Sequence, residues 1–267
     1  MSLLTSSLLD PFFVSVDAAS LTSWRIGSLL SGRTAVLRIP HMIDSESCDK
    51  LVERLDDLTL DLYDEQRVYP PIARFGPAIN DFRRDGRLDD GYWEHASRAA
   101  RAWSEVDFEG DPVALSIQAF RQAWPGSVEV ATVQGRPLFA GMIREINGGA
   151  HAHFDDVVRE FPAGIFDTEV VAQLAFNLYL SMPETGGETS VWRRRWQPAD
   201  ERYRHRYGYD RELMANCQSI VAKPGAGDVL VFDPRNYHAV EPGDGRRRIA
   251  VAFFIALSAR GDLLIWS

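Results

Sequence analysis

The chain has 267 residues, of which 45% are hydrophobic and 25% are charged, the composition of an ordinary globular protein. Its 38 acidic residues outnumber its 29 basic residues, and the net charge of -9 argues against a nucleic-acid partner. The chain has two cysteines, Cys48 and Cys217, which form neither a disulfide framework nor a paired metal site, so a reducing environment is expected.

No stretch of the sequence predicts a membrane segment. Residues 1–13 carry no positive charge ahead of their short apolar patches, unlike a signal peptide. The longest apolar run, residues 249–257, is about half as long as a membrane helix requires. We therefore expect a cytoplasmic protein with no membrane partner, either a monomer or a homodimer.

The first half of the chain predicts helices. Residues 1–34 are expected to form an irregular or partly helical lead-in, and residues 34–39 a short strand. Residues 61–90, with their Pro-Pro and Gly-Pro pairs, predict a long loop. N-caps at Asp44 or Ser45 and at Asp111, together with the helical spacing of apolar residues, predict three helices: 44–58, 90–105 and 111–124.

The second half predicts strands. Residues 128–133 and 137–146 flank the turn Gln134-Gly135-Arg136 and predict a hairpin. Seven or eight strands joined by tight turns indicate a mainly β fold with flanking helices, a jelly-roll barrel. We expect a single domain over residues 1–267, in which a largely helical part (1–127) packs outside a jelly-roll core (128–267). The further strands are expected at 173–182, 188–192, 219–222, 228–232, 249–257 and 263–266.

Two of these strands have unequal faces, since side chains alternate along a strand. One face of 173–182 is apolar, whereas the other carries Ala175, Asn177 and Tyr179. One face of 249–257 is likewise apolar, and the opposite face continues the row Arg246, Arg248, Ala250, Ala252. Small residues with a few hydrogen-bonding groups suit a cavity, and a buried arginine at the head of such a face needs an anionic partner.

The segment Gly148–Asp156 places two imidazoles and two carboxylates within six residues, directly after a predicted strand. His238 lies 85 residues beyond His153, also just after a predicted strand. Two histidines and one carboxylate at strand ends can bind one face of an octahedral metal, the ligand set of non-haem Fe(II) sites.

These motifs resemble the Fe(II)/2-oxoglutarate-dependent dioxygenases, especially the prolyl-hydroxylase-like branch and the related amino-acid hydroxylases and radical halogenases. The resemblance rests on His153-Phe-Asp155, on His238 and on Arg248 ten residues further on. Flanking pieces agree with it and extend it over residues 35–257: Ile43–Cys48, Tyr179–Ser181, Gly186–Thr189 and Lys223–Asp233.

The resemblance implies roles for individual residues. His153, Asp155 and His238 would be the catalytic metal ligands, and Arg248 would hold the far carboxylate of 2-oxoglutarate, with Tyr179 as a second donor. The other candidates at the cosubstrate site are Arg246, as the alternative anchor, and Asn177. The family usually has a hydroxyl residue two positions after the arginine, where this chain has Ala250.

The activity implied by the resemblance is hydroxylation of an unactivated C–H bond of a small molecule, an amino acid or a natural-product intermediate. The reaction would use Fe(II), 2-oxoglutarate and O2, with ascorbate as a reductant. Related halogenases replace the ligand carboxylate by Gly or Ala, so the retained Asp155 favours hydroxylation. Desaturation, cyclisation and halogenation stay as alternatives. The candidate substrate-binding residues are Asp156, His151 and Trp192, and Asp156 has loop capping as an equal alternative.

Two further alternatives are open. His151-Ala-His153 is also the histidine pair of cupins, which would make the chain a cupin-like metal- or ligand-binding protein without turnover. The segment Arg193–Tyr209 is rich in Arg and Tyr, and it is interpreted either as a solvated insertion or as a lid over the barrel mouth.

Overall fold

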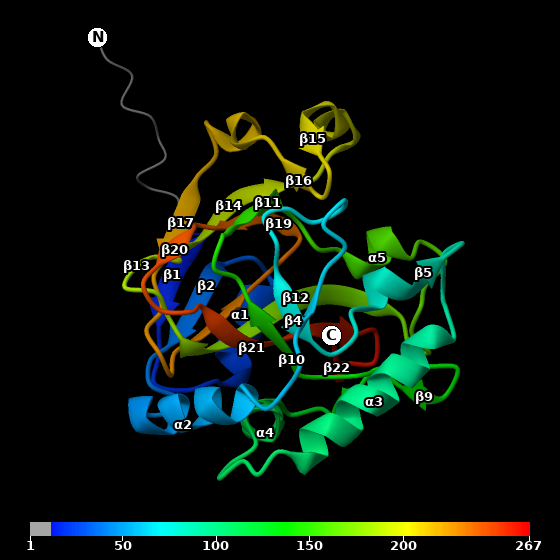
Figure 1. The fold of residues 1–267 in the computed structure, drawn as a ribbon. Coiled ribbons are helices and arrows are strands. Elements are labelled where there is room, and N and C mark those ends of the chain that lie inside the picture. The colour runs from blue at the N-terminus through cyan, green and yellow to red at the C-terminus, as the bar shows by residue number, and fades with distance from the viewer. Residues whose placement is uncertain (1–11) are drawn as a thin grey trace.

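The computed structural model describes residues 12–267, and the predicted lead-in is therefore outside the description up to residue 11. Two β-sheets face each other, and helices cover the outer side of the larger sheet (Figure 1). The strands form two separate layers with the jelly-roll character expected, and the hydrogen-bonded strand pairs do not close into a continuous barrel within residues 12–267.

The larger sheet has ten strands. Eight lie side by side in the order β1-β2-β18-β12-β21-β10-β4-β3, β22 pairs with β21, and β7 pairs with β22. The bounds in this order are Val14–Asp17, Thr34–Ile39, Val229–Phe232, Val170–Ser181, Ile249–Ser258, Met142–Glu145, Ala73–Phe75, Asp61–Leu62, then Leu263–Trp266 (β22) and Val128–Val130 (β7).

The smaller sheet has six strands in the order β15-β16-β11-β19-β14-β17. Their bounds are Arg204–His205, Gly208–Tyr209, Ala150–His153, Asn236–Val240, Thr189–Arg195 and Ser219–Ala222. Three short pairs complete the strands: β13 (Thr185–Gly186) with β20 (Gly243–Asp244), β5 (Arg83–Arg84) with β6 (Arg87–Leu88), and β8 (Thr132–Val133) with β9 (Arg136–Pro137).

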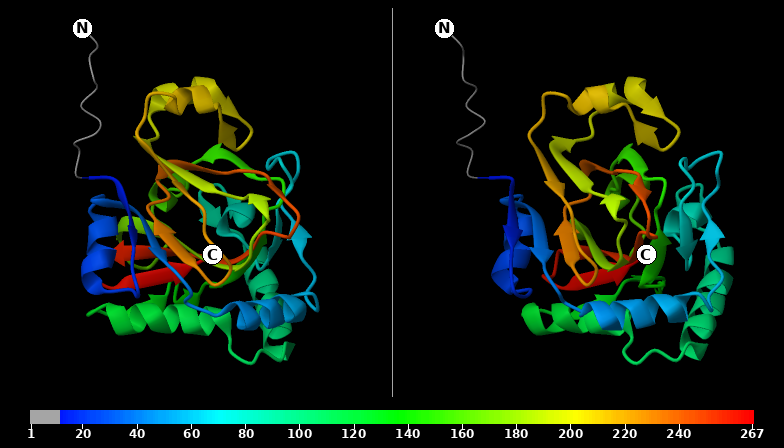
Figure 2. Two further views of the ribbon diagram at one scale, coloured as in Figure 1. Left: turned by 90° about the vertical axis from the view of Figure 1, so that its left-hand side faces the viewer. Right: turned by 60° about the vertical axis from the view of Figure 1, so that its left-hand side comes forward.

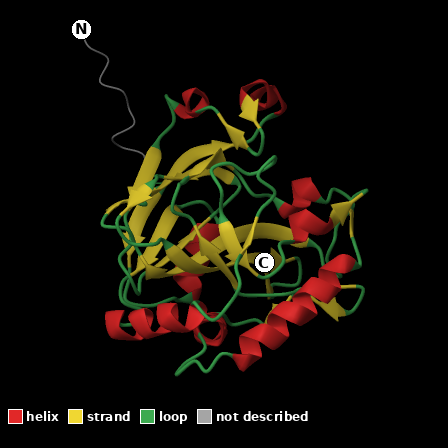
Figure 3. Cartoon of the chain, viewed as in Figure 1, coloured by secondary structure: helices red, strands yellow, loops and turns green. Residues whose placement is uncertain are grey.

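The longest helices lie below the larger sheet in the view of Figure 3, which shows helices in red, and shorter ones lie at the top and right. Asp44 and Asp111 cap α2 and α4 as predicted, each accepting backbone N–H bonds of the first helical turn. None of the helices in the described chain is long and apolar enough to cross a membrane. The bounds are α1 Ser23–Leu30, α2 Ser45–Leu55, α3 Gly91–Glu105, α4 Pro112–Ala123 and α5 Val157–Glu160, with short 3₁₀ helices η2 (Ile79–Phe82), η3 (Pro198–Tyr203) and η4 (Arg211–Met214).

The apolar faces predicted for β12 and β21 form the core between this sheet and the helices. Phe176 of β12 stacks on Phe253 of β21 with ring centroids 4.4 Å apart, and Phe120 of α4 meets both rings edge-on. The helices α2 and α4 run along this side of the sheet, at the bottom of both views in Figure 2. The opposite faces of β12 and β21 are thereby left toward the smaller sheet.

Three expectations differ from the structure. Residues 128–146 do not form one hairpin: only β8 and β9 pair across the turn, whereas β10 pairs with β21 and β4. The expected loop at 61–90 contains short strands, and two of them join the larger sheet. His238 lies inside β19 rather than after a strand. Each difference depends on a partner strand distant in sequence, which local pattern cannot supply.

Candidate metal centre and binding cavity

Antiparallel pairing of β11 and β19 brings the two distant histidines together. His153 and His238 are direct cross-strand partners, and their ring centroids are 4.2 Å apart. Asp155 follows β11 by two residues, and its backbone N–H donates to the carbonyl of Pro234. One ligand atom from each of His153, Asp155 and His238 lies within 4.8 Å of the others, so these three residues can hold a metal ion.

Hydrogen bonds orient both imidazoles toward this point. Nδ1 of His153 lies 2.7 Å from the carbonyl of His151, and Nδ1 of His238 lies 3.0 Å from that of Asn236. A carbonyl only accepts, so each Nδ1 donates and each Nε2 keeps a free lone pair for a metal. The Nε2 atoms lie 3.9 and 3.6 Å from Oδ2 of Asp155. Two neutral imidazoles and one carboxylate on one side of a point are a suitable donor set for Fe(II).

The electrostatics keep His153 and Asp155 in the protonation states that a metal requires. Burial lowers the pKa of His153 to about 4, and the neighbouring His238 ring acts in the same direction. Burial alone would raise the pKa of Asp155, but the adjacent His238 and His153 rings and the charge of Arg144 hold it below its ordinary value. At neutral pH the site therefore presents a carboxylate and an uncharged His153.

The glycine before β11 is required by the close approach of the two strands. Gly149 has a φ of +80°, and a Cβ there would lie 2.7 Å from the carbonyl oxygen of Val240 on β19. A larger residue would push the strands apart and separate the two histidines.

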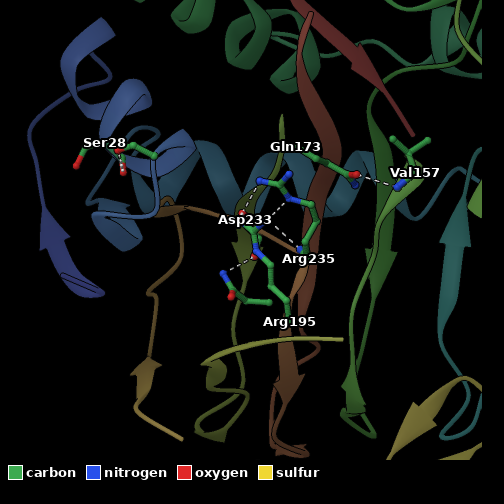
Figure 4. Close-up of polar contacts among 8 residues, drawn as sticks. Ser28, Val157, Gln173, Arg195, Asp233 and Arg235 are labelled. Atoms are coloured by element: carbon green, nitrogen blue, oxygen red, sulfur yellow. Dashed lines mark hydrogen bonds and ion pairs between the residues drawn. The ribbon is translucent and has the colours of Figure 1, made fainter. Parts of the chain in front are cut away.

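Polar contacts around the centre hold the segments that carry the ligands (Figure 4). Asp233 precedes β19, and its carboxylate accepts from Nε and Nη2 of Arg235 and, at 2.7 Å, from Arg195 of β14. Gln173 of β12 accepts the N–H of Val157 at 2.9 Å, which fixes the start of α5 just after Asp155. The metal ligands thus sit on segments tied to both sheets.

Arg248 lies on the other sheet, at the start of β21, and its side chain is buried. Its Nη2 donates to the hydroxyls of Tyr179 and Thr189, and its Nε donates to the carbonyl of Gly187. Among the described residues, no carboxylate lies within ion-pair distance of this guanidinium. A buried arginine held only by neutral groups is suited to bind an incoming carboxylate.

A cavity of about 710 Å³ joins the metal ligands to Arg248. Its volume is typical of small-molecule sites. Predicted residues on its wall are His153, Asp155, His238, Arg248, Tyr179 and Asn177, together with Arg204, Tyr207 and Tyr209 of the Arg/Tyr-rich segment. The hairpin β15–β16 pairs with β11 and so extends the smaller sheet over the cavity, which supports the lid interpretation.

Four other predicted residues are placed outside the cavity wall. The Arg246 side chain is 68% exposed and faces Asp49, because residues 246–248 precede β21 and the strand alternation does not extend to them. Asp156 caps α5, and the exposed His151 ring stacks on Tyr207. Trp192 packs in a cluster with Tyr209 and Met214 behind the smaller sheet.

Two of the cavity residues absent from the expectations carry charged side chains that bear on the site. Arg144 of β10 projects into the cavity, and its charge affects both His153 and Asp155. Glu160 ends α5 and also lines the cavity. The only sequence signal was a charged residue interrupting the row Met142, Arg144, Ile146 on one face of a strand; a helix of four residues gives no comparable signal for Glu160.

Comparison with known proteins gives two kinds of match. The family described as carrier-protein-independent halogenase WelO5 matches residues 13–267. An L-γ-glutamyl-L-propargylglycine hydroxylase of Streptantibioticus cattleyicolor is 42% identical over 96% of both chains. A leucinostatins biosynthesis cluster protein S of Purpureocillium lilacinum is 31% identical over 67% of this chain and 75% of its own.

Among solved structures, an N-substituted L-amino acid dioxygenase from Burkholderia ambifaria superposes with a TM-score of 0.60, covering 92% of each chain at 14% identity. At this level of identity the match concerns the fold alone. It agrees with the two facing sheets and the outer helices described above.

Proposed function

Because the chain belongs to the family of the carrier-protein-independent halogenase WelO5, within the Fe(II)/2-oxoglutarate-dependent oxygenases, we propose that it hydroxylates a C–H bond of a small amino acid derivative bearing carboxylate groups. The relative with 42% identity is named as a hydroxylase of a γ-glutamyl amino acid. The observation that carries the substrate class is the charge of the cavity wall.

The cavity wall is basic although the protein as a whole is acidic. Among the described residues, six arginines line it, whereas only two acidic side chains do, those of Asp155 and Glu160. Three of the arginines are engaged by carboxylates elsewhere, Arg67 by Asp81 and both Arg159 and Arg204 by Glu201. The positive charge of the three remaining arginines, Arg83, Arg144 and Arg248, favours the binding of anionic ligands. Since 2-oxoglutarate would use one arginine, a second carboxylate compound is the substrate that fits the rest.

Fe(II) and 2-oxoglutarate are the cofactors of this enzyme class, and when bound they activate O2 for C–H oxidation while 2-oxoglutarate becomes succinate. His153, Asp155 and His238 are the residues that would hold the metal. Arg248, with Tyr179 and Thr189 beside it, would bind the far carboxylate of 2-oxoglutarate. The wall of this space comes from both sheets, and partial exclusion of water by a bound substrate would limit stray oxidation.

Halogenation is the second candidate, because the matching family is described by a halogenase. Asp155 argues for hydroxylation, since its carboxylate faces both Nε2 atoms and occupies the position that a halide would need. With Asp155 present, the protein would offer the metal two imidazoles and one carboxylate oxygen, and no protein ligand is missing for a halide to replace.

The proposal is tested by incubating the protein with Fe(II), 2-oxoglutarate, ascorbate and a panel of γ-glutamyl dipeptides, N-acyl amino acids and free amino acids, with and without chloride. We expect succinate release coupled to a product that is heavier by one oxygen atom. A chlorinated product would assign the second function. A cupin-like protein without turnover would consume no 2-oxoglutarate with any member of the panel.

A further inference from the structure

Arg144 is half-buried, and the inner part of its guanidinium has an environment that a cation rarely keeps without a ligand. It lies on β10 opposite Ala250 of β21, so its side chain enters the cavity beside a methyl group. Its Nε is fully buried without a hydrogen-bond partner. Its one described side-chain contact is the Phe254 ring, 5.6 Å from the guanidinium carbon. A buried charged donor in this state is costly unless a ligand accepts from it.

Arg144 also lies close to the metal ligands. It lines the same cavity as the three candidate ligands, and its positive charge lowers the pKa of both His153 and Asp155. Arg248 is already positioned by Tyr179, Thr189 and Gly187. A carboxylate on Arg144 would therefore lie beside the metal centre, where the carbon to be oxidised must also lie.

Glu160 is an acidic residue on the same cavity wall. Asn80 of η2 hydrogen-bonds to it, and no described cation lies within ion-pair distance of its carboxylate. Burial, followed by the charge of Asp155, raises its pKa to about 8. Arg83, whose charge acts against this rise, is exposed and lies over the Phe161 ring. A ligand ammonium would complete the surroundings of this carboxylate.

We propose that Arg144 binds the carboxylate of the residue that is oxidised and that Glu160 binds the ammonium group of the substrate. The inference rests on the proposed function and adds the two contacts that select the substrate. In a γ-glutamyl amino acid these two charges lie at opposite ends of the molecule, so the pair would fix its direction in the cavity. The oxidised residue would then face the metal and the glutamyl head would face α5.

Binding measurements on the holoenzyme test each contact separately. Fe(II) and 2-oxoglutarate are bound without O2, and calorimetry gives the Kd of L-γ-glutamyl-L-propargylglycine, its C-terminal carboxamide and its N-acetyl derivative. We expect the wild-type protein to bind the unmodified dipeptide about 10- to 100-fold more tightly than either derivative, the range of one charge-assisted contact.

The variants should lose one preference each. Arg144→Met should bind the dipeptide and its carboxamide equally and still discriminate against the N-acetyl derivative, whereas Glu160→Gln should do the reverse. Arg159→Met is the matched control, since Arg159 lines the same cavity but is engaged by Glu201 and Trp196. Its two preferences should match those of the wild type.

Three results would overturn the inference in distinguishable ways. If Arg144→Met weakens 2-oxoglutarate binding and keeps the preference for the free carboxylate, Arg144 belongs to the cosubstrate site. If the wild-type protein binds the dipeptide and its two derivatives with equal Kd, Arg144 and Glu160 do not make the two proposed contacts, although the proposed function stands. If the wild-type protein binds none of the γ-glutamyl dipeptides, N-acyl amino acids and free amino acids used in the activity assay, both the inference and the proposed function fail.

Discussion

The two ends of the cavity treat their arginines differently. At one end, Arg248 is fixed by two hydroxyls and a carbonyl before any ligand arrives. At the other end, Arg144 meets only an aromatic ring and Glu160 has no described cation at ion-pair distance. The end proposed to bind 2-oxoglutarate is therefore assembled in advance, whereas the end proposed to bind the substrate has charged groups whose partners the substrate would supply.

The largest expected effect comes from the metal centre between the two ends. His238→Ala should lower 2-oxoglutarate consumption at least about 10³-fold with or without substrate, because loss of a ligand removes several kcal/mol of transition-state stabilisation. Substrate-dependent and substrate-independent succinate release measure it, alongside bound metal. His151→Ala is the control, since its ring is outside the cavity wall; an equal loss there would point to the cupin-like ligand set.

Arg248→Met should weaken binding at one end of the cavity and leave binding at the other end unchanged. We expect the KM for 2-oxoglutarate to rise about 10²-fold, because charge-assisted hydrogen bonds contribute about 1.5–3 kcal/mol each. The affinity for the substrate, measured apart from turnover, should change little. Arg246→Met should leave the KM unchanged, since that side chain points to solvent; a rise there would restore Arg246 as the anchor.

The pH dependence of stability should reveal the uncompensated carboxylate at the substrate end. The pKa of Glu160 is raised, so the folded state holds its proton more tightly than the unfolded state, and stability falls as pH rises toward about 8. Metal-free protein should lose about 2 kcal/mol in its free energy of unfolding between pH 6.5 and about 8.5. His153, with its lowered pKa, costs stability only as pH falls below its ordinary value of 6.5, so this window excludes it.

Urea unfolding with a chelator present measures this change. Glu160→Gln has no ionisable group at the site, so its stability should be nearly constant over the same window. An equal slope in the variant would assign the pH dependence to another group and remove the asymmetry between the two ends.

A smaller effect is expected from the support of β19. Asp233→Asn would weaken the contacts with Arg195 and Arg235 and loosen the turn that leads to His238. Metal affinity should fall about 10-fold, the lower range for groups that orient a ligand. Equilibrium metal titration measures it, and Asp228→Asn, which changes a buried carboxylate held by Arg38 instead, should leave metal affinity unchanged.

The order of the elements and the chemistry of the ligands could be predicted from local signals. Two of these signals involve residues within a few positions of each other: the helix caps at Asp44 and Asp111, and the two-faced strands β12 and β21. The third is a fixed motif, which combines His153-Phe-Asp155 with His238 and Arg248. The family match and the core packing confirm the superfamily and the two-sheet fold.

The tertiary structure decided which polar residues enter the cavity. Arg246 and Arg248 were equivalent by strand alternation, but β21 begins at Ile249, and only Arg248 turns inward. Arg144 and Glu160 are candidate substrate-binding residues because the pairing of β10 with β21 and the position of α5 after Asp155 place both in the cavity wall. Alternation within a strand is local, so sequence determines it; the partner across a sheet and the bend before a strand depend on contacts far along the chain, and only the fold determines those.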